Sequence, residues 1–586
     1  MRLRPLTGIL LMIAAASASS RMAAVDPLPS PAPPGVPAAM RKLQGGDAAG
    51  AAKILEGVVA REPRNAPAWR GLGTASLRLK NLDRAEEAFR KTLEIEPGSP
   101  RAMYNLGAVA GRRENADSAF EWLKKARATG KIDMTYAQVD PDLAALRQDP
   151  RFPSILPSPA DFERPFVESV KVLREWDGEA ANDQFGWIAR NIGDVDGDGV
   201  NDIVTSAPTK EIGGAASAGR IYVYSTKSGK LLWSADGRPG EELGTGVESA
   251  GDTNRDGIPD VIAGAPGGGK AYLYSGRDGR VLRTFTAESA DVDFGRHVSA
   301  AGDVDGDGFA DVLVGSPGKQ GDAKAVGRAY LYSGKDGRAL LALKGERPGD
   351  EFGSTVGGST AGKKRFLIVG ASSAGPRQTG RTYVYEGATS KPKFVIDSDD
   401  TGAALGAMFV SVAGDVNGDG VPDVYASDFS NSAKGPSTGR VYVHSGRDGS
   451  RLLTLTGETA GEGFGIGPAT AGDVDGDGRA DLIVGAWQYS GAAVSGGRAY
   501  LFSGKDGRLI KTFTCRTPGD TFGFDAVGLG DVDGDGTIDF LISSAWSGIH
   551  GYHSGRMFLL SSGVQKKTGQ ANGRKMFRTT AGMPSP

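Results

Sequence analysis

The chain has 586 residues, of which 39% are hydrophobic, and this is enough to form more than one buried core. The formal net charge is only −2, so composition gives no general attraction to nucleic acid, and we expect no nucleic-acid partner. Cys515 is the only cysteine, which excludes a disulfide within the chain.

The N-terminus has the pattern of an export signal in residues 1–18. Arg2 and Arg4 precede an apolar run, and Ala16-Ser17-Ala18 offers a cleavage site of small residues. The run is too short to span a bilayer, and no later stretch reaches that length. We therefore expect a secreted protein (extracellular, or at the bacterial cell surface or in the periplasm) without a membrane span. Residues 19–38 are predicted to form a proline-rich linker.

Helical periodicity follows in residues 39–130. Apolar and small residues recur with a period of 34, and the recurring set is Trp69, Leu72, Gly73, Ala85 and Phe89, then Met103, Leu106, Gly107, Ala119 and Leu123. This set resembles the tetratricopeptide repeat, which implies a small all-α solenoid whose groove holds a peptide segment. The alternative is a generic bundle of helical hairpins. Residues 131–163 are predicted to be a capping helix, from Asp140 to Leu156, and a linker.

Short alternating strands replace the helical pattern in residues 164–563. A Phe-Gly or Leu-Gly pair recurs there every 51 to 59 residues, and four predicted strands accompany each pair. Four strands are the content of one propeller blade, so the pattern predicts an all-β seven-bladed propeller. The seven pairs are Phe185-Gly186, Leu243-Gly244, Phe294-Gly295, Phe352-Gly353, Leu405-Gly406, Phe464-Gly465 and Phe522-Gly523.

One fourth strand is missing at the C-terminal end of this region. Val170 to Trp176, just before the first pair, matches Arg280 to Phe285 before the third pair. We therefore predict that the N-terminal strand completes the last blade and closes the ring without a covalent link. Residues 564–586 contain several lysines and arginines and are predicted to be a disordered basic tail.

Six of the seven units contain a nine-residue loop rich in aspartate. Acidic or amide side chains stand at positions 1, 3, 5 and 9 of each loop, and a glycine at position 6 permits a sharp turn. With the main-chain carbonyl of position 7 added, the candidate ligands are Asp194, Asp196, Asp198, Val200 and Asp202; Asp252, Asn254, Asp256, Ile258 and Asp260; Asp303, Asp305, Asp307, Phe309 and Asp311; Asp415, Asn417, Asp419, Val421 and Asp423; Asp473, Asp475, Asp477, Arg479 and Asp481; and Asp531, Asp533, Asp535, Thr537 and Asp539.

This spacing predicts calcium sites, about six in all. Calcium takes six to eight oxygen ligands, and alternate side chains with one carbonyl can supply them. Crowded carboxylates would otherwise repel each other. The loops lack the glutamate at position 12 and the flanking helices of an EF-hand, so we expect structural clips rather than sensors. The alternative is a set of solvated turns without metal.

The fourth unit lacks the loop. Ala361 to Arg365 stands in its place, and we expect a lysine or arginine there to supply the positive charge that calcium supplies elsewhere.

Together, the Phe-Gly pairs, the aspartate loops and triplets such as Gly264-Ala265-Pro266 resemble the FG-GAP repeat family, best known from the integrin α-chain head. The resemblance covers about 400 residues and implies a calcium-bearing seven-bladed propeller. Because no paired cysteines or membrane span follow, it does not identify an integrin. Cell adhesion is therefore only a suggestion that this family makes.

Strand parity places the aspartate loops on one face and the connections between second and third strands on the other. These connections are long and dissimilar, which suits recognition of a protein or glycan ligand. Packing between blades is the alternative for their aromatic residues, above all for the two tryptophans. The candidate ligand residues are Asp428, Phe429, Trp487, Tyr489, Trp546, His550 and Tyr552.

No nucleophile elbow, zinc-protease motif or phosphate loop occurs in the sequence. We expect a binding protein rather than an enzyme. The alternative is a calcium-assisted propeller enzyme, either a polysaccharide lyase or a quinoprotein-like dehydrogenase. Turns such as Ser333 to Arg338 and Ser503 to Arg508 have a superficial similarity to quinoprotein blades.

Overall fold

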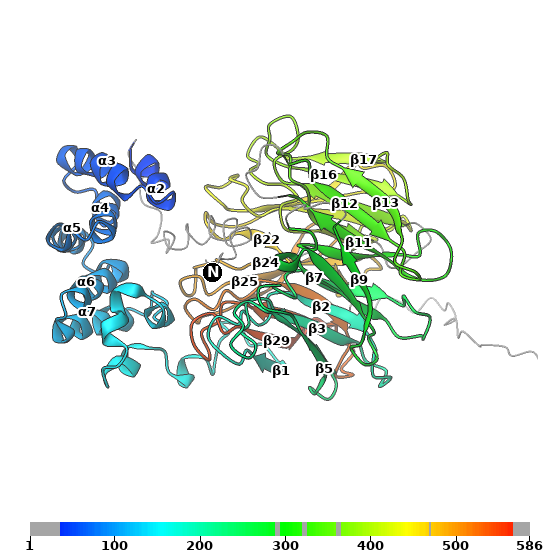
Figure 1. Cartoon of the computed structure of the whole chain (residues 1–586), viewed down its shortest axis with the longest axis horizontal. Helices are drawn as coiled ribbons and strands as arrows, with labels where there is room; N and C mark the ends of the chain where they lie inside the picture. Colours follow the sequence, from blue (N-terminus) through cyan, green and yellow to red (C-terminus); the bar gives the residue numbers. More distant parts are fainter. Residues whose placement is uncertain (1–34, 288–292, 319–324, 359–364, 468–469, 567–586) are drawn as a thin grey trace, which may run out of the picture.

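The computed structural model describes residues 35–287, 293–318, 325–358, 365–467 and 470–566. Figure 1 shows two parts, a group of helices and, beside it, a ring of β-sheets. The predicted export signal and nearly all of the predicted basic tail lie outside the described residues.

The six α-helices of the described residues form three antiparallel pairs. Asn65, Asn81 and Asn115 each begin a helix by accepting a hydrogen bond from the amide three residues later. Within a pair the helices approach closely at glycine: a Cβ on Gly73 would meet the Phe89 ring at 2.5 Å. The helices are α2 (Val36–Gln44), α3 (Ala48–Arg61), α4 (Ala66–Arg78), α5 (Leu82–Ile95), α6 (Pro100–Arg112) and α7 (Ala116–Ala128).

The predicted capping helix is not formed. Four short 3-10 helices follow α7 instead: η1 (Thr135–Gln138), η2 (Pro141–Leu146), η3 (Phe152–Ile155) and η4 (Pro159–Asp161). Pro150 and Pro153, in the interior of the predicted helix, interrupt helical hydrogen bonding. The Asp140 side chain caps η2 by accepting from the Asp142 amide. Leu143 and Phe152 are nevertheless buried and close the end of the helical core, as the sequence pattern predicted.

The ring consists of seven antiparallel sheets, which confirms the predicted seven-bladed propeller. In blade 6 the first strand is split into β22 and β23. The strands of blades 1 to 3 are β2 (Ala189–Gly193), β3 (Asp202–Ala207), β4 (Arg220–Tyr224) and β5 (Leu231–Asp236); β6 (Val247–Gly251), β7 (Asp260–Ala265), β8 (Lys270–Tyr274) and β9 (Val281–Thr286), with η5 (Pro266–Gly268) after β7; and β10 (Val298–Gly302), β11 (Asp311–Ser316), β12 (Arg328–Tyr332) and β13 (Ala339–Lys344). Those of blades 4 to 6 are β14 (Phe352–Gly358), β15 (Phe366–Ala371), β16 (Arg381–Glu386) and β17 (Phe394–Asp397); β18 (Val410–Gly414), β19 (Asp423–Asp428), β20 (Arg440–His444) and β21 (Arg451–Thr456); and β22 (Phe464–Ile466), β23 (Thr470–Gly472), β24 (Asp481–Ala486), β25 (Arg498–Phe502) and β26 (Leu509–Thr514).

Blade 7 contains both ends of the ring. Its strands are β27 (Ala526–Gly530), β28 (Asp539–Ser544), β29 (Arg556–Ser561) and the N-terminal β1 (Val172–Asp177). β1 pairs antiparallel with β29, with Trp176 opposite Met557. The predicted non-covalent closure is therefore confirmed.

The Phe-Gly pairs hold neighbouring strands together. Phe185, for example, is buried and meets the Tyr222 ring of the third strand edge-on, with 5.3 Å between ring centroids. The following glycine has a positive φ, and a Cβ on Gly295 would lie 2.3 Å from the Lys270 carbonyl oxygen. The pair thus combines a large buried ring with a backbone that only glycine allows.

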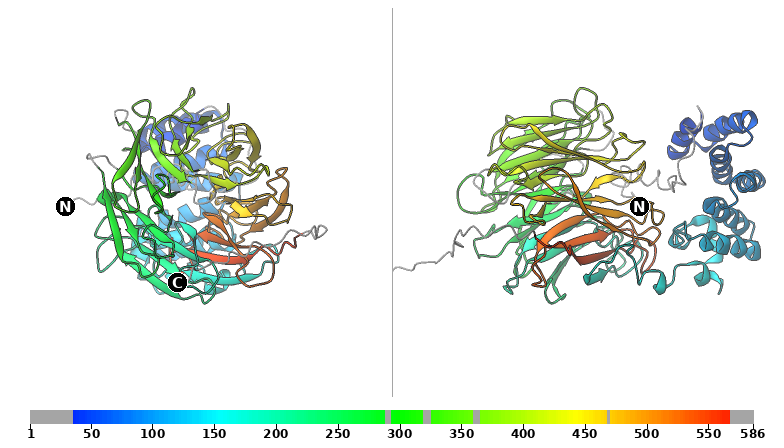
Figure 2. Two further views of the ribbon diagram at one scale, coloured as in Figure 1. Left: turned by 90° about the vertical axis from the view of Figure 1, so that its right-hand side faces the viewer. Right: turned by 180° about the vertical axis from the view of Figure 1, so that it is seen from behind.

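The helical part packs against the propeller at blade 7. The Tyr552 amide donates to Gln138 Oε1 at 2.7 Å, and the Tyr552 and Tyr136 rings meet with centroids 5.7 Å apart. Arg556 Nη1 also donates to the Phe162 carbonyl. Tyr552 belongs to the connection between β28 and β29, so the helices lie on the face opposite the aspartate loops. In Figure 2, left, they are seen behind the propeller.

Candidate metal sites

Each aspartate loop joins the first strand of its blade to the second. Position 9 is the first residue of the second strand in all six units, for example Asp202 in β3 and Asp539 in β28. A rigid strand therefore fixes one end of each loop.

The carboxylate at position 1 organises the turn. In blade 1, Asp194 accepts hydrogen bonds from the amides of Gly197 at 2.7 Å and Gly199 at 2.8 Å. Both glycines have a positive φ, of 80° and 85°. These bonds need only residues that are close in sequence, which explains why the nine-residue pattern recurs with so little change.

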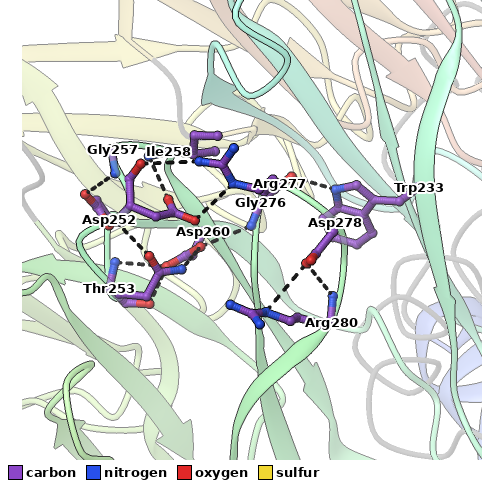
Figure 3. Close-up of polar contacts among 12 residues, drawn as sticks. Trp233, Asp252, Thr253, Gly257, Ile258, Asp260, Gly276, Arg277, Asp278 and Arg280 are labelled. Carbon is purple, nitrogen blue, oxygen red and sulfur yellow. Dashed lines mark hydrogen bonds and ion pairs between the residues drawn. The ribbon is translucent and has the colours of Figure 1, made fainter.

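The carboxylate at position 9 lies beneath the loop and is fully buried. Asp260 Oδ2 accepts from the Thr253 amide at 2.9 Å, and its Oδ1 accepts from the Gly276 amide at 3.1 Å (Figure 3). Burial, and to a smaller extent the Asp256 carboxylate, raises the pKa of Asp260 to about 6. A bound cation would oppose this shift because it favours the charged carboxylate.

In four loops, three carboxylates approach so closely that one oxygen of each lies within 4.8 Å of the others. The donors are all oxygen, which suits a hard cation such as calcium. Asp475 Oδ1 is buried and has no hydrogen-bond partner, and an ion in the loop would give it one. The groups are Asp194, Asp196 and Asp202; Asp303, Asp305 and Asp311; Asp473, Asp475 and Asp481; and Asp531, Asp533 and Asp535.

The two remaining loops have asparagine at position 3. In blade 2, Asn254 Oδ1 accepts from the Asp256 amide at 2.8 Å. In blade 5, Asn417 Oδ1 accepts from the Asp419 amide at 2.9 Å. The backbone arrangement of an aspartate loop is therefore kept there. At position 7 the main-chain amide is hydrogen-bonded within the loop: the Val200 amide donates to Asp198 Oδ1 at 3.0 Å.

The turn between the third and fourth strands carries basic residues that pair with the loop of the same blade. Arg447 contacts Asp419 at 2.9 Å and Arg338 contacts Asp305 at 3.0 Å. In sequence these turns have only a superficial similarity to quinoprotein blades, and their ion pairs with the aspartate loops were not predicted. The signal was present, because each basic residue recurs in step with an aspartate loop.

Blade 7 obtains its basic residue from the other end of the ring. There the third and fourth strands are not joined, and Lys171, just before β1, places its ammonium 2.5 Å from Asp533 and 3.1 Å from Asp535. The acidic residues of the seventh-blade loop and the lysine that pairs with them therefore come from opposite ends of the propeller sequence.

In blade 4 an apolar residue stands where the other six blades have the buried carboxylate of position 9. In the strand alignment, Phe366 of β15 occupies the place of Asp202, and it is fully buried. An apolar ring thus replaces the buried position-9 carboxylate. That a lysine or arginine supplies the positive charge here stays a prediction, because Ala361 to Lys364 lie outside the described residues.

The candidate ligand residues are distributed unevenly between core and surface. Phe429, Trp487 and Trp546 are buried in one hydrophobic cluster. The Asp428 carboxylate accepts from the amides of Ala403 and Ala404 and so holds the preceding connection.

The other three candidates lie nearer the surface. Tyr489 is half-buried, with the Arg498 guanidinium 3.8 Å from its ring centroid. His550 is exposed, and its Nε2 lies 3.5 Å from Asp177. Tyr552 packs against the helical part.

A charged cluster near the propeller axis was missed by the sequence analysis. Arg190 of blade 1 donates to Glu248 of blade 2 at 2.8 Å and also to Asp525 of blade 7. Arg190 and Glu248 stand at equivalent positions of β2 and β6, and Asp525 immediately precedes β27. A comparison of the seven first strands, position by position, could have found them.

Comparison with known proteins agrees with this architecture. An FG-GAP repeat model matches residues 185–224, and an FG-GAP-like repeat model matches residues 252–314 and 415–484. A tetratricopeptide repeat model matches residues 37–100. Together with the seven blades, these matches show that the chain combines an FG-GAP repeat propeller with a tetratricopeptide-repeat segment.

Curated relatives include integrin α-chains and a phospholipase. Integrin alpha-PS5 of Drosophila melanogaster is 31% identical over 183 residues, which cover 28% of this chain and 17% of the integrin. Integrin alpha-4 of Xenopus laevis is 28% identical over 200 residues, 31% of this chain and 19% of that protein. Phosphatidylinositol-glycan-specific phospholipase D of Bos taurus is 35% identical over 144 residues, 21% of this chain and 17% of the phospholipase. The chain spans less than a quarter of the length of these relatives.

Within the described residues, the helices are all too short or too polar to cross a bilayer.

Proposed function

We propose that this protein is a secreted, calcium-binding scaffold whose propeller binds a protein or glycan ligand. The observation that carries the calcium part is the gathering of oxygen donors in the loops, with the buried Oδ1 of Asp475 left without a partner. The similarity to integrin α-chains supports an interaction role. The helical repeats would offer a peptide-binding groove as a second surface.

Calcium would act as a set of clips that join strands within each blade. Asp194, Asp303, Asp473 and Asp531 and their loop partners would hold the ion, with the two asparagine-containing loops as further sites. Calcium at ten times its dissociation constant adds about 1.4 kcal/mol per site, or roughly 8 kcal/mol over six independent sites. Removal of calcium should therefore lower the melting temperature of the propeller strongly.

Elemental analysis and melting with and without EGTA test this proposal. We expect about six calcium ions per chain, in line with the six loops, and a large fall in melting temperature when EGTA is added. Magnesium at equal concentration is the control, because it demands a smaller octahedral site. An unchanged melt in EGTA, or well under one ion per chain in millimolar calcium, would contradict the proposal.

The ligand would bind on the face opposite the calcium loops, where the connections between second and third strands differ most. The helical part occupies this face at blade 7, and Tyr552 is engaged there. Tyr489 and His550 are the more accessible of the candidate contacts. A glycan array and a pull-down with the whole chain, in calcium and in EGTA, test the proposal; a Tyr489→Ala variant should bind less strongly.

Enzymatic activity is the second candidate, and the similarity to a phospholipase D is the observation in its favour. An assay of phosphatidylinositol-glycan cleavage by the purified chain tests it directly. Polysaccharide cleavage and dehydrogenase activity remain further alternatives. A turnover that persists in the Glu248→Gln variant but is lost in EGTA would place the chemistry at the loops rather than near the axis.

A further inference from the structure

Three of the aspartate loops form a matched set within the propeller. In blades 1, 3 and 6, the carboxylates at positions 1, 3 and 9 gather so that one oxygen of each lies within 4.8 Å of the others. The turn between the third and fourth strands packs beside each loop in the same way: the amide of its second residue donates to the position-9 carboxylate, at 3.2 Å in blade 1, 3.3 Å in blade 3 and 2.9 Å in blade 6. The three loops are therefore three copies of one candidate site. Their turns are residues 225–230, 333–338 and 503–508.

The third residue of the turn carries a positive charge in all three blades. Its ammonium lies 2.8 Å from the main-chain carbonyl oxygen of Asp198 in blade 1, 3.5 Å from the Asp307 carboxylate in blade 3 and 3.9 Å from the Asp477 carboxylate in blade 6. Because this ammonium is close to loop position 5 in each case, it does not distinguish the three loops. The residues that carry it are Lys227, Lys335 and Lys505.

The sixth residue of the turn does distinguish them. In blade 3, Arg338 Nη2 donates to Asp305 Oδ2 at 3.0 Å. In blade 6, Arg508 Nη2 donates to Asp475 Oδ2 at 2.9 Å. Both carboxylates stand at loop position 3 and belong to the gathered set. One oxygen of a candidate calcium ligand is thus engaged by a guanidinium in these two blades.

Blade 1 lacks this ion pair. Lys230 occupies the sixth position of its turn, and its side chain is exposed. In the part of the chain that the structure describes, the gathered carboxylates of blade 1 take part in no ion pair. Their full charge is therefore available to a cation. These carboxylates are Asp194, Asp196 and Asp202.

An arginine at this place opposes a divalent ion in two ways. It holds one oxygen of the position-3 carboxylate, and its charge repels the ion that the same carboxylate would bind. Repulsion between a divalent and a monovalent cation across a single ligand amounts to about tenfold in affinity in water-like surroundings. Orientation of the carboxylate by the arginine is the opposing effect. This effect is small here, because the side chains of Arg338 and Arg508 are 62% and 49% exposed.

We propose that Arg338 and Arg508 set the calcium affinity of their loops, so that the loop of blade 1 fills at a lower calcium concentration than the loops of blades 3 and 6. The clips would then form in sequence as calcium rises, rather than all together. This inference rests on the proposed calcium binding and adds which of the matched sites is strong and which are weak.

Hydrogen exchange followed by mass spectrometry over a calcium titration tests the proposal on the whole chain, because separate peptides report each loop. An ion that holds a loop should slow exchange of its amides, such as the Gly306 amide that donates to Asp303. We expect the midpoint of protection for residues 194–202 at about tenfold lower calcium than for residues 303–311 and 473–481. Equal midpoints in the three loops would overturn the proposal.

Arg338→Gln removes the charge from the blade 3 site and should lower its calcium midpoint about tenfold, with blades 1 and 6 unchanged. Arg338→Lys keeps the charge and should stay near the wild-type midpoint. Arg508→Gln should act on blade 6 in the same way as Arg338→Gln acts on blade 3. The matched control is Arg280→Gln, at the same turn position of blade 2, where the guanidinium lies 3.9 Å from Asp278 of its own turn. It should shift the blade 2 midpoint by less than about twofold, because a charge that does not contact the loop is screened.

The outcomes separate this inference from the proposed function. An unchanged blade 3 midpoint in the folded Arg338→Gln chain would contradict the role of the charge, and a higher midpoint would mean that the arginine orients the carboxylate instead. Added salt should narrow the gap between blades 1 and 3, since the repulsion is screened. Absence of calcium protection in every loop would contradict calcium binding itself, and this inference with it.

Discussion

At the residue scale, the buried carboxylates of this chain differ in how they are compensated. Asp520 is fully buried and paired with Arg556 at 2.8 Å. Glu462 is also buried, but it accepts hydrogen bonds from the Glu458 amide and from the hydroxyls of Thr459 and Tyr500 rather than from a cation. Burial raises the pKa of Glu462 to about 7, and the Glu458 charge adds to the effect.

This shift predicts a pH dependence of stability. The folded pKa of Glu462 lies above the unfolded value, so folding favours its protonated form. Its contribution to the free energy of unfolding is greatest below about pH 4.5 and falls as the pH rises toward 7. Glu462→Gln should therefore be close to neutral at pH 5 and should stabilise by about 1–3 kcal/mol at pH 8. Urea unfolding at both pH values measures this, and exposed Glu163→Gln is the control. An equal effect of Glu462→Gln at both pH values would contradict the assignment.

A second prediction concerns one loop. Asp475→Ala, which leaves no oxygen ligand at position 3, should remove about one calcium ion per chain and about 1.4 kcal/mol of calcium-dependent stability, because one clip is lost and the others remain. Asp506→Ala, in the neighbouring exposed turn, is the matched control. Calcium titration followed by elemental analysis checks the stoichiometry, and an unchanged number of ions in the Asp475→Ala chain would remove this loop from the set.

At the scale of elements, β1 has a special position because it is the one strand that reaches its blade from the opposite end of the ring. Trp176 is its buried residue, and it occupies the register position that Phe285 has in β9. Both rings fill the same kind of space against a third strand. Unlike β9, however, the strand β1 that carries Trp176 is not joined to its blade by a loop.

Trp176→Ala and Phe285→Ala should each cost about 3–5 kcal/mol through the cavity they leave. Only Trp176→Ala should also open the ring, because β1 is then held mainly by its backbone pairing. Hydrogen exchange should show faster exchange confined to β29 and β1 in Trp176→Ala. The same pattern in Phe285→Ala would mean that the closing strand is no weaker than the others.

At the scale of the whole molecule, the helical part and the propeller meet through a small set of contacts at blade 7. The Tyr552 ring contacts the Tyr136 ring, and the Tyr552 main-chain amide donates a hydrogen bond to the Gln138 side chain. The Cβ of a residue replacing Gly548 would lie 2.3 Å from the Thr135 side chain, so the two surfaces are close there as well. These contacts hold the helical repeats against the propeller face.

Tyr552→Ala should loosen this relation without unfolding either part. We expect a larger radius of gyration in small-angle X-ray scattering and an unchanged melting temperature of the propeller. His550→Ala removes an exposed ring two residues away and is the control. A radius that stays the same in Tyr552→Ala would show that the other contacts suffice for docking.

Much of the fold follows from local pattern. The Phe-Gly pairs and the loops recur with little change because each loop is held by bonds between residues a few positions apart, as between Asp194 and Gly197. The missing fourth strand could be found by counting, so the ring closure was predictable too. The capping helix was mispredicted because Pro150 and Pro153, both in its interior, outweigh the apolar spacing of Leu143 and Phe152.

The sequence by itself determined the repeats, the number of blades and the residues of the aspartate loops, because these depend on short-range spacing that any one unit displays. Only the tertiary structure brought together Arg190 and Asp525, which are 335 residues apart, and placed Lys171 on the loop of blade 7. It also put Tyr552 against the helical part. Such contacts depend on how the ring closes and how its parts dock, and no local spacing encodes the distance between side chains on different blades.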